Sequence, residues 1–387
     1  MTKKCEDAEC IFAFLIDYPY NSPLKIQKKY DIIGVYFFIK GRVNMIYKNT
    51  EIHNAAELAI NEKDGSMTWY RLPKSLMDTF ELGGGNGMSL SSTGVEIRFV
   101  IKSGSAAIKM QSISEPGVTT CFHVYRGGIQ GGWQDHEADK FVFAEPHDFV
   151  IERSDNLDTL KKIADDFGDG FSPEVVRIIF DRGRYRILDI TGDIVPPAKE
   201  QLPQKTLMCY GSSITHGSNS IDSSHAWASV LAHNLNMDLR NLGMAGSCAM
   251  EHGVIDYIAS EGENGRWDTA VLELGINVLS WEEDKIRERV SYAISQVAGR
   301  NKDKNVYVIS PFYCGDDYKG SDAPDKWRRL IKETAEKLNF KNVRVINGLE
   351  VLDSMKYISA DEVHPNIYGV QRIADTLTKR LQQKNTD

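Results

Sequence analysis

The rhythm of hydrophobic residues changes once along this chain of 387 residues, at a proline-containing segment over residues 195–204. Before this segment, short runs of β-branched and aromatic residues are separated by Gly, Ser, Asn, Asp or Pro. After it, apolar strand-like runs alternate with amphipathic helical stretches. This change predicts two domains, over residues 1–194 and 205–387, joined by a linker over 195–204.

The first half reads as an antiparallel β domain, because many short strands divided by turn residues are typical of β-sandwiches and jelly rolls. One helical segment, DTLKKIADDF, interrupts the strands. The predicted strands are IGVYFFIK, RVNMIYK, GVEIRFVIKS, AAIKMQS, TCFHVYR, KFVFAE, HDFVIER, VVRIIFD and YRILDI. We therefore expect a jelly-roll-like β-sandwich over residues 1–194.

The second half predicts an α/β domain, because strands that alternate with helices form parallel sheets covered on both faces. The predicted strands are TLMCY, LRNLG, TAVLELG, VYVISP and VRVING. The predicted helices are HAWASVLAHNL, WEEDKIRERVSYAISQVA, DKWRRLIKETAEKL and IYGVQRIADTLTKRLQQ, with Pro365 expected to begin the last one. In such sheets the functional crevice lies beyond the carboxyl ends of the strands.

Composition excludes several classes of partner. The net charge is −8 and no long Lys/Arg run occurs, which argues against a nucleic-acid or anionic-membrane surface. The six cysteines form no Cys-x-x-Cys pair, so neither a zinc site nor a redox pair is expected. The N-terminal apolar run IFAFLI is too short for a signal sequence or a membrane span. We expect a cytoplasmic protein, and the oligomeric state stays open.

Polar or small residues follow several of the predicted strands. Ser213 lies in GSSITHG, Gly243 in NLGMAGS and Asn277 in LGINV. Asp361 and His364 lie in SADEVHPNIYG, just before the last helix. Since the carboxyl ends of parallel strands meet at one edge of a sheet, we expect these five residues to converge.

These residue types suit acyl transfer. A serine hydroxyl is a weak nucleophile that needs a base, which His364 can supply, and Asp361 can orient the imidazole. The developing oxyanion needs fixed donors, for which we expect the backbone N–H groups of Ser213 and Gly243 and the side-chain amide of Asn277. The pattern predicts a serine esterase that forms an acyl-enzyme and needs no metal or cofactor.

The residues around Ser213 also allow interpretations other than catalysis. In the simplest reading, Ser213 is a helix N-cap. A phosphate-binding loop is disfavoured, because GSSITHG lacks the Gly-Lys-Ser/Thr ending of such loops. The nucleophile elbow of α/β-hydrolases needs a glycine where Thr215 stands. His216 follows Ser213 too closely to act as its base and is expected to line the pocket or the turn. Glu273 lies in an apolar strand and is expected to be a buried, paired acid.

The stretches GSSITHG, NLGMAG, LGIN and DEVHP resemble, in order, the four blocks of the SGNH or GDSL-like hydrolases. The resemblance covers residues 205–387. It implies a flavodoxin-like three-layer domain and a serine esterase, with Ser213 as nucleophile, Asp361 and His364 completing the triad, and Gly243 and Asn277 as oxyanion donors. A β-rich front half joined to such a domain is similar to two-domain esterases and acyltransferases, some of them carbohydrate deacetylases.

The chain departs from the family at two positions. The usual Asp before the nucleophile is Ser212, and the Asp that often follows the third-block Asn is Val278. Neither position makes bonds to substrate, so we expect activity on a small-molecule or glycan ester with a short acyl group. Two alternatives stay open: an acyltransferase with the same triad, and a carbohydrate-binding protein with a vestigial hydrolase domain.

Overall fold

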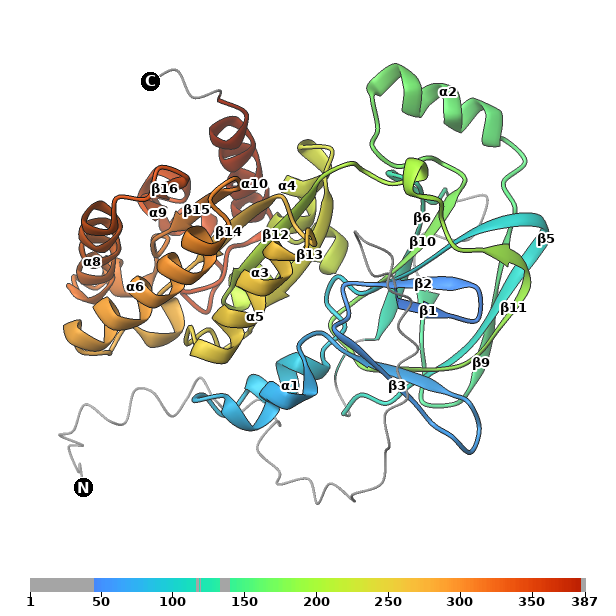
Figure 1. Ribbon diagram of the computed structural model, residues 1–387, viewed down its shortest axis with the longest axis horizontal. Helices are drawn as coiled ribbons and strands as arrows, with labels where there is room; N and C mark the ends of the chain where they lie inside the picture. Colours follow the sequence, from blue (N-terminus) through green and yellow to red (C-terminus); the bar gives the residue numbers. More distant parts are fainter. Residues whose placement is uncertain (1–44, 116–117, 119, 133–139, 384–387) are drawn as a thin grey trace, which may run out of the picture.

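The computed structural model describes residues 45–383 except 116–117, 119 and 133–139 (Figure 1). The predicted strand IGVYFFIK and two cysteines, Cys5 and Cys10, lie outside the described residues. The described chain forms an antiparallel β region followed by a helix-covered parallel sheet, and the two parts pack side by side (Figure 1).

The strands of the N-terminal region are joined by antiparallel hydrogen-bonded pairs into one sheet, whose main path runs β3-β4-β11-β5-β10-β6-β7. The described strands are β1 (Met45–Tyr47), β2 (Thr50–His53), β3 (Glu57–Ile60), β4 (Met67–Tyr70), β5 (Glu96–Ser112), β6 (Cys121–Arg126), β7 (Ile129–Gln130), β8 (Lys140–Phe141), β9 (His147–Glu152), β10 (Val175–Phe180) and β11 (Tyr185–Val195). The prediction of an antiparallel β-rich region is confirmed, whereas its description as a jelly-roll-like sandwich stays a prediction.

Strand β5 organises this region. The sequence runs GVEIRFVIKS and AAIKMQS were predicted as two strands, but they form one strand of 17 residues. Its first part pairs with β2 and β10, and its second part pairs with β9, while β11 runs along most of its length. Inward-facing side chains such as Ile97, Phe99 and Ile108 are fully buried in the core of the region. A strand that changes partners half-way cannot be recognised from its alternation alone.

Among the described residues before β11, the helical segments are η2 (Lys74–Thr79), α1 (Gly85–Leu90) and α2 (Leu157–Phe167). The prediction of a helix in DTLKKIADDF is confirmed by α2, which ends at Gly168 in a left-handed conformation. Helix α1 lies in the glycine-rich stretch ELGGGNGMSL over residues 81–90.

The C-terminal sheet is parallel throughout and has the order β13-β12-β14-β15-β16. Numbered from the first strand of this domain, that order is 2-1-3-4-5, the order of flavodoxin-like folds. The five strands are β12 (Thr206–Gly211), β13 (Asp238–Gly243), β14 (Thr269–Glu273), β15 (Asn305–Ile309) and β16 (Val343–Ile346). The predicted parallel sheet is confirmed.

Helices cover both faces of this sheet (Figure 1), as predicted. One buried cluster joins the sheet to α4 and α10, and another joins it to α5, α6 and α8. The helical segments are α3 (Ser213–His216), η5 (Ser223–His225), α4 (Trp227–Asn234), α5 (His252–Glu263), η6 (Ile276–Val278), α6 (Glu283–Arg300), α7 (Gly315–Tyr318), α8 (Ala323–Leu338), α9 (Gly348–Val351), η7 (Met355–Tyr357) and α10 (Ile367–Gln382).

Two local expectations for the helices need correction. Helix α5 was not predicted, because Gly253 and Gly262 lower its intrinsic helix propensity and packing against the sheet compensates. Helix α10 begins at Ile367 and not at Pro365. The side chain of Asn366 accepts the N–H groups of Tyr368 and Gly369, so asparagine caps the helix and proline precedes the cap.

The segment predicted as a linker is packed against the β region. Strand β11 extends to Val195, and a short 3-10 helix, η4 (Lys199–Gln201), follows it. Leu202 is buried in a small cluster with Val100, Phe171 and Val175. We keep the division of the chain into residues 1–194 and 205–387 as a proposal.

A buried ion pair joins the two parts of the chain. The guanidinium of Arg98 on β5 donates to both carboxylate oxygens of Asp238 at the start of β13, at 2.9 and 2.7 Å. Arg98 also donates to Glu96, which in turn binds Arg177, and the Arg98 side chain is fully buried. Buried ion pairs tolerate the loss of a partner poorly, because an uncompensated charge is left in the interior.

A second buried arginine, Arg71, follows β4 and reaches the end of β13. It donates to the carbonyl groups of Ser91 and Met88 in the N-terminal part. It also donates to the carbonyl groups of Asn241 and Gly243 in the C-terminal part. The charges of Arg71 and Arg98 therefore find all of these acceptors only when the two parts of the chain are docked.

No helix among the described residues combines the length and the apolar character needed to cross a membrane.

We predict that Arg98→Leu destabilises the protein by about 3–5 kcal/mol, because the buried acids around Arg98 lose their compensating charge. Urea unfolding followed by tryptophan fluorescence measures the change. The control is Arg329→Leu, since Arg329 is half exposed and pairs with Glu283 on the surface, where pairs contribute roughly 0–1 kcal/mol. Equal losses in the two variants would contradict a special role for the buried pair.

Candidate active site

Ser213 is the first residue of helix α3, directly after strand β12. Ser212 precedes it in extended conformation, and the Ser212 hydroxyl accepts the N–H of Ile214 at 3.1 Å. The N-cap of α3 is therefore Ser212, and Ser213 is not the cap. Gly211 is required at the end of the strand, because a Cβ there would lie 2.3 Å from the Thr215 hydroxyl. This tight turn holds the Ser213 side chain beyond the carboxyl end of β12.

The carboxyl group of Glu273, at the end of β14, lies beneath this turn. Its Oε2 accepts the Ser212 N–H at 2.8 Å, the Ser212 hydroxyl at 2.7 Å and the Thr215 hydroxyl at 3.0 Å. Its Oε1 is buried with no hydrogen-bond partner among the described residues. Burial raises the pKa of Glu273 to about 7, against the opposing effect of these hydrogen bonds. The expectation of a buried acid is confirmed, and its partners are hydroxyl and amide groups.

The structure brings Ser213, His364 and Asp361 into one hydrogen-bonded line. The hydroxyl oxygen of Ser213 lies 2.7 Å from His364 Nε2, and His364 Nδ1 lies 2.8 Å from Asp361 Oδ2. These are the contacts that a nucleophile, its base and an orienting carboxylate require. The serine comes from the start of α3, and the other two residues come from the loop before α10.

Asp361 is held by four donors. Its Oδ1 accepts the N–H groups of Val363 and His364, at 3.0 and 2.9 Å. Its Oδ2 accepts the His364 imidazole and also the side-chain amide of Asn219, at 2.7 Å. Burial alone would raise the pKa of Asp361, but the N–H groups and the imidazole outweigh it and hold this pKa below its ordinary value. A carboxylate held in this way stays ionised and fixes the orientation of His364.

Two of the three predicted oxyanion donors have N–H groups without a hydrogen-bond partner among the described residues. The Ser213 N–H has no hydrogen-bond partner among the described residues. The Asn277 Oδ1 accepts the Cys248 N–H at 3.1 Å, which orients the side chain and leaves its Nδ2 without a partner among the described residues. Both groups can therefore donate to a bound oxygen.

The prediction for Gly243 does not fit the structure. Its N–H donates to Asn241 Oδ1 at 2.9 Å, and the residue is buried against the backbone of His216. The N–H groups of Met244, Ser247, Cys248, Ala249 and Met250, further along the same loop, also have acceptors. The N–H groups of Ala245 and Gly246 are left, and Gly246 is exposed with φ +64°.

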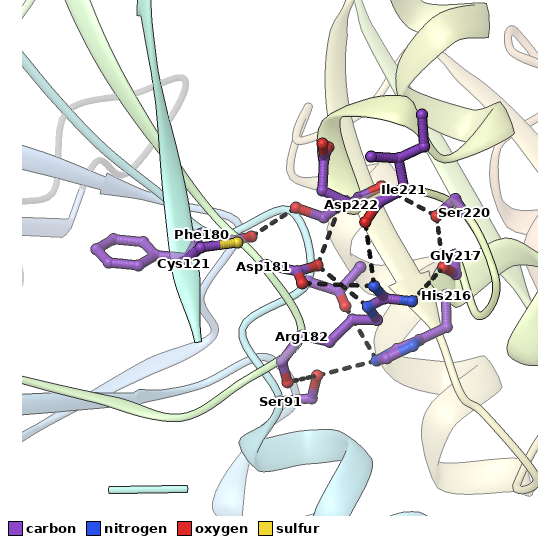
Figure 2. A network of polar contacts seen from close by, with 12 residues as sticks. Ser91, Cys121, Phe180, Asp181, Arg182, His216, Gly217, Ser220, Ile221 and Asp222 are labelled. Carbon is purple, nitrogen blue, oxygen red and sulfur yellow. Dashed lines mark hydrogen bonds and ion pairs between the residues drawn. The ribbon is translucent and has the colours of Figure 1, made fainter. Parts of the chain in front are cut away.

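The N-terminal part of the chain contacts the nucleophile turn through His216. The Nε2 of His216 lies 2.9 Å from the Ser91 hydroxyl and 3.0 Å from the Thr93 hydroxyl. The Ser91 hydroxyl donates its proton to the Arg182 carbonyl (Figure 2). Since this proton is already used, His216 donates from Nε2 to the Ser91 oxygen. Burial, with the nearby cations Arg71 and Arg182, holds the pKa of His216 well below its ordinary value. The neutral imidazole of His216 therefore links the Ser213 turn to Ser91 and Thr93 in the N-terminal part of the chain.

The glycine-rich stretch before α1 reaches the loop after β13. A Cβ on Gly84 would lie 2.7 Å from the Ser247 hydroxyl and 3.7 Å from the Ala245 carbonyl oxygen. The stretch thus packs beside the loop that contains Gly246, and only a residue without a side chain allows this approach.

Among the described residues, no group of three or more His, Cys, Asp or Glu side chains has an arrangement that could hold a metal ion.

Residues 204–382 match the model of the GDSL-like lipase/acylhydrolase family. This region is a GDSL-like acylhydrolase domain. The resemblance seen in the four sequence blocks is thereby confirmed for almost the whole C-terminal half. No curated protein matches the chain by sequence.

Solved structures share the fold of most of this chain, including its N-terminal β region. A salicylyl-acyltransferase from a tetracycline biosynthetic pathway has a TM-score of 0.65 and 16% identity, and covers 88% of this chain and 96% of its own. A family two carbohydrate esterase from Cellvibrio japonicus has a TM-score of 0.59 and 12% identity, and covers 87% and 95%. A family two carbohydrate esterase from Clostridium thermocellum has a TM-score of 0.53 and 16% identity, and covers 76% and 92%. At these identities the likeness establishes the fold.

The sequence did not reveal the contact between Asn219 and Asp361. It also indicated Gly243 as an oxyanion donor, whereas it is the N–H of Gly246 that has no partner among the described residues. The Asn-Leu-Gly sequence at 241–243 gave a usable signal, since asparagine often accepts the N–H two residues further on. Asn219 gave no such signal, because it contacts Asp361 across 142 positions of the chain.

We predict that the acylhydrolase loses stability between about pH 4.5 and 7 because of Glu273. The folded protein holds the Glu273 proton up to a pKa of about 7, whereas the ordinary value is 4.5. The stability supplied by this proton is therefore fully present below the lower value and is lost as the pH rises through the higher one.

Glu273→Gln mimics the protonated acid and should lack this component. Urea unfolding of both proteins between pH 4.5 and 8 measures the difference, which should favour the Gln variant increasingly as the pH rises. Parallel stability profiles for the two proteins would mean that Glu273 does not titrate in this range.

Proposed function

We propose that the protein is a serine esterase that hydrolyses short-chain acyl esters of a polar small molecule or glycan through an acyl-enzyme on Ser213. The observation that carries this proposal is the line from the Ser213 hydroxyl to His364 Nε2 (2.7 Å) and from His364 Nδ1 to Asp361 (2.8 Å). Membership of residues 204–382 in the GDSL-like acylhydrolases supports it.

In the first half of the proposed reaction, Ser213 Oγ attacks the ester carbonyl carbon as His364 Nε2 takes its proton. The tetrahedral oxyanion accepts hydrogen bonds from the Ser213 N–H and the Asn277 amide. We assign the third donor to Gly246 in place of Gly243, because the Gly246 N–H is unoccupied and exposed. The C–O bond to the alcohol then breaks, and the alcohol leaves with the proton from His364.

In the second half, water attacks the acyl-enzyme while His364 takes one of its protons. The tetrahedral intermediate collapses, the acid is released, and the proton returns to Ser213 Oγ. Asp361 keeps its negative charge throughout and stabilises the imidazolium that forms in each half-reaction.

The substrate class rests on similarity to named proteins. Two of the structures that share the fold are family two carbohydrate esterases, and an acetyl xylan esterase from Butyrivibrio proteoclasticus shares it with a TM-score of 0.50 and 12% identity. An acetylated sugar is therefore the first substrate to test. The salicylyl-acyltransferase has the same fold, and product analysis with a competing alcohol distinguishes transfer from hydrolysis.

We predict that Ser213→Ala lowers turnover of p-nitrophenyl acetate by about 10⁴–10⁶, because the nucleophile is lost while the oxyanion donors remain. Esters from acetate to octanoate should show a preference for acetate in the wild type. Ser218→Ala, five residues further along, is the matched control and should keep wild-type turnover. Wild-type turnover in Ser213→Ala would remove Ser213 from the mechanism.

We predict that Asn277→Asp and Asn277→Ala each lower kcat by about 10²–10³ with a much smaller change in KM, because one oxyanion donor is lost. The Asp variant keeps an oxygen that can accept the Cys248 N–H, so it separates donation from support of the loop. If Asp restored the activity that Ala loses, the amide would serve the loop and not the oxyanion.

A further inference from the structure

The loop over residues 217–223 runs between α3 and η5 and carries Asn219 next to the triad. Asn219 has φ +62°, a left-handed conformation that asparagine and glycine tolerate best. Its Nδ2 donates to Asp361 Oδ2 at 2.7 Å, the same oxygen that binds the His364 imidazole. The position of this amide therefore depends on the conformation of the loop.

Arg182, which follows β10 in the N-terminal part, contacts Gly217 and Ile221, the residues two positions before and after Asn219. Its Nη1 donates to the Gly217 carbonyl at 2.9 Å, and its Nη2 lies 3.5 Å from the Ile221 carbonyl oxygen. One guanidinium thus contacts the backbone on both sides of Asn219. A planar guanidinium can hold two such acceptors at once, which an ammonium group cannot do in the same geometry.

Neighbouring groups fix both Arg182 and the far end of the loop. Asp181 accepts the Nε–H of Arg182 at 3.1 Å (Figure 2). The same carboxylate accepts the Ser223 N–H at 3.1 Å. The Ser223 hydroxyl donates to the Phe180 carbonyl at 2.6 Å. The turn at the end of β10 therefore binds the loop at three points, residues 217, 221 and 223, through side chains and backbone.

We propose that Arg182 and Asn219 are positioning residues for the triad, so that the N-terminal β region sets the alignment of Asp361 and His364 through the loop over 217–223. This proposal rests on the proposed esterase function. Arg182 fixes the loop, Asn219 fixes Asp361, and Asp361 orients the imidazole that takes the Ser213 proton.

The amide also modifies the charge that His364 meets. The Asn219 amide donates to Asp361 Oδ2 and so weakens the attraction between the carboxylate charge and His364. Removal of this donor therefore favours the imidazolium form of His364. The other charged groups around this pair are Glu362, which binds Lys319, and the Asp181–Arg182 pair. They are unchanged in the Asn219 variants below.

The test compares Asn219→Asp with Asn219→Gly, since both residues accept a left-handed backbone. Asn219→Asp places a second carboxylate beside Asp361, so the acid limb of the kcat/KM profile should move to higher pH by roughly one unit. Asn219→Gly should move it less and lower kcat about tenfold through looser alignment. KM should stay within about twofold in both variants, which a direct contact between Asn219 and substrate would not allow.

The matched control is Asn236→Asp. Asn236 also has a left-handed backbone, and its side chain binds Gly168 and Gly170 in the N-terminal part of the chain. Its variant should leave the acid limb in place. An equal shift in Asn236→Asp and Asn219→Asp would overturn the proposal, because general charge or interface effects would then explain both.

The role of Arg182 is tested by Arg182→Met alone and in the Asn219→Gly background. Alone, it should lower kcat about tenfold, and combined with Asn219→Gly it should add little, because both changes act on the same contact to Asp361. Multiplied losses in the double variant would separate Arg182 from the triad and overturn its part of the proposal.

Failure of this proposal can be told apart from failure of the esterase function. NMR titration of His364, assigned with a His364→Gln variant, needs no turnover, and its midpoint should rise in Asn219→Asp. An unchanged midpoint overturns the positioning proposal even when Ser213→Ala is inactive on esters. Wild-type turnover in Ser213→Ala overturns the proposed function, whatever the Asn219 variants show.

Discussion

The structure depends on a guanidinium that is buried where four backbone carbonyl groups converge. Arg71 is fully buried, and its hydrogen-bond acceptors are carbonyl oxygens from both parts of the chain. Burial lowers the pKa of Arg71 to about 9, so the group stays charged at neutral pH. A buried cation without its acceptors is costly, and these four acceptors exist together only when the β region is docked on the end of β13.

That docking constrains the chemistry at the nucleophile turn. Burial, with the nearby cations Arg71 and Arg182, lowers the pKa of His216 and keeps it neutral. A neutral His216 can donate to Ser91 while the Ser91 hydroxyl donates to the Arg182 carbonyl. Beneath the turn, the Glu273 carboxyl group accepts hydrogen bonds from the N–H and the hydroxyl of Ser212. The turn that carries Ser213 is thus held from below by the parallel sheet and from the side by the β region.

The sequence allowed the layers and the reacting groups to be predicted, because both depend on local patterns. Apolar runs marked the five parallel strands, and the polar residues after them marked the edge where Ser213, His364 and Asp361 meet. The choice of Gly243 failed, because a glycine in a motif does not reveal whether its N–H is already occupied. Asn219 could not be predicted, since its contact depends on how a distant loop is folded.

The bounds of one strand and the presence of one helix were less predictable for a related reason. Strand β5 exchanges partners along its length, and a turn signal inside it divided one strand into two. Helix α5 has weak local propensity and is formed by packing on the sheet. In each case the decisive interactions lie far apart in the chain, where sequence periodicity carries no information.

The approach of Gly84 to the loop that carries Gly246 has a consequence for how such enzymes can diversify. The contact between these two stretches is encoded at two distant places in the gene, one in each half. Recombination that exchanged whole halves between homologues would preserve Ser213, Asp361 and His364 and still mismatch this contact. New specificities in this architecture therefore arise more readily by paired changes on the two sides of the interface than by shuffling of intact halves.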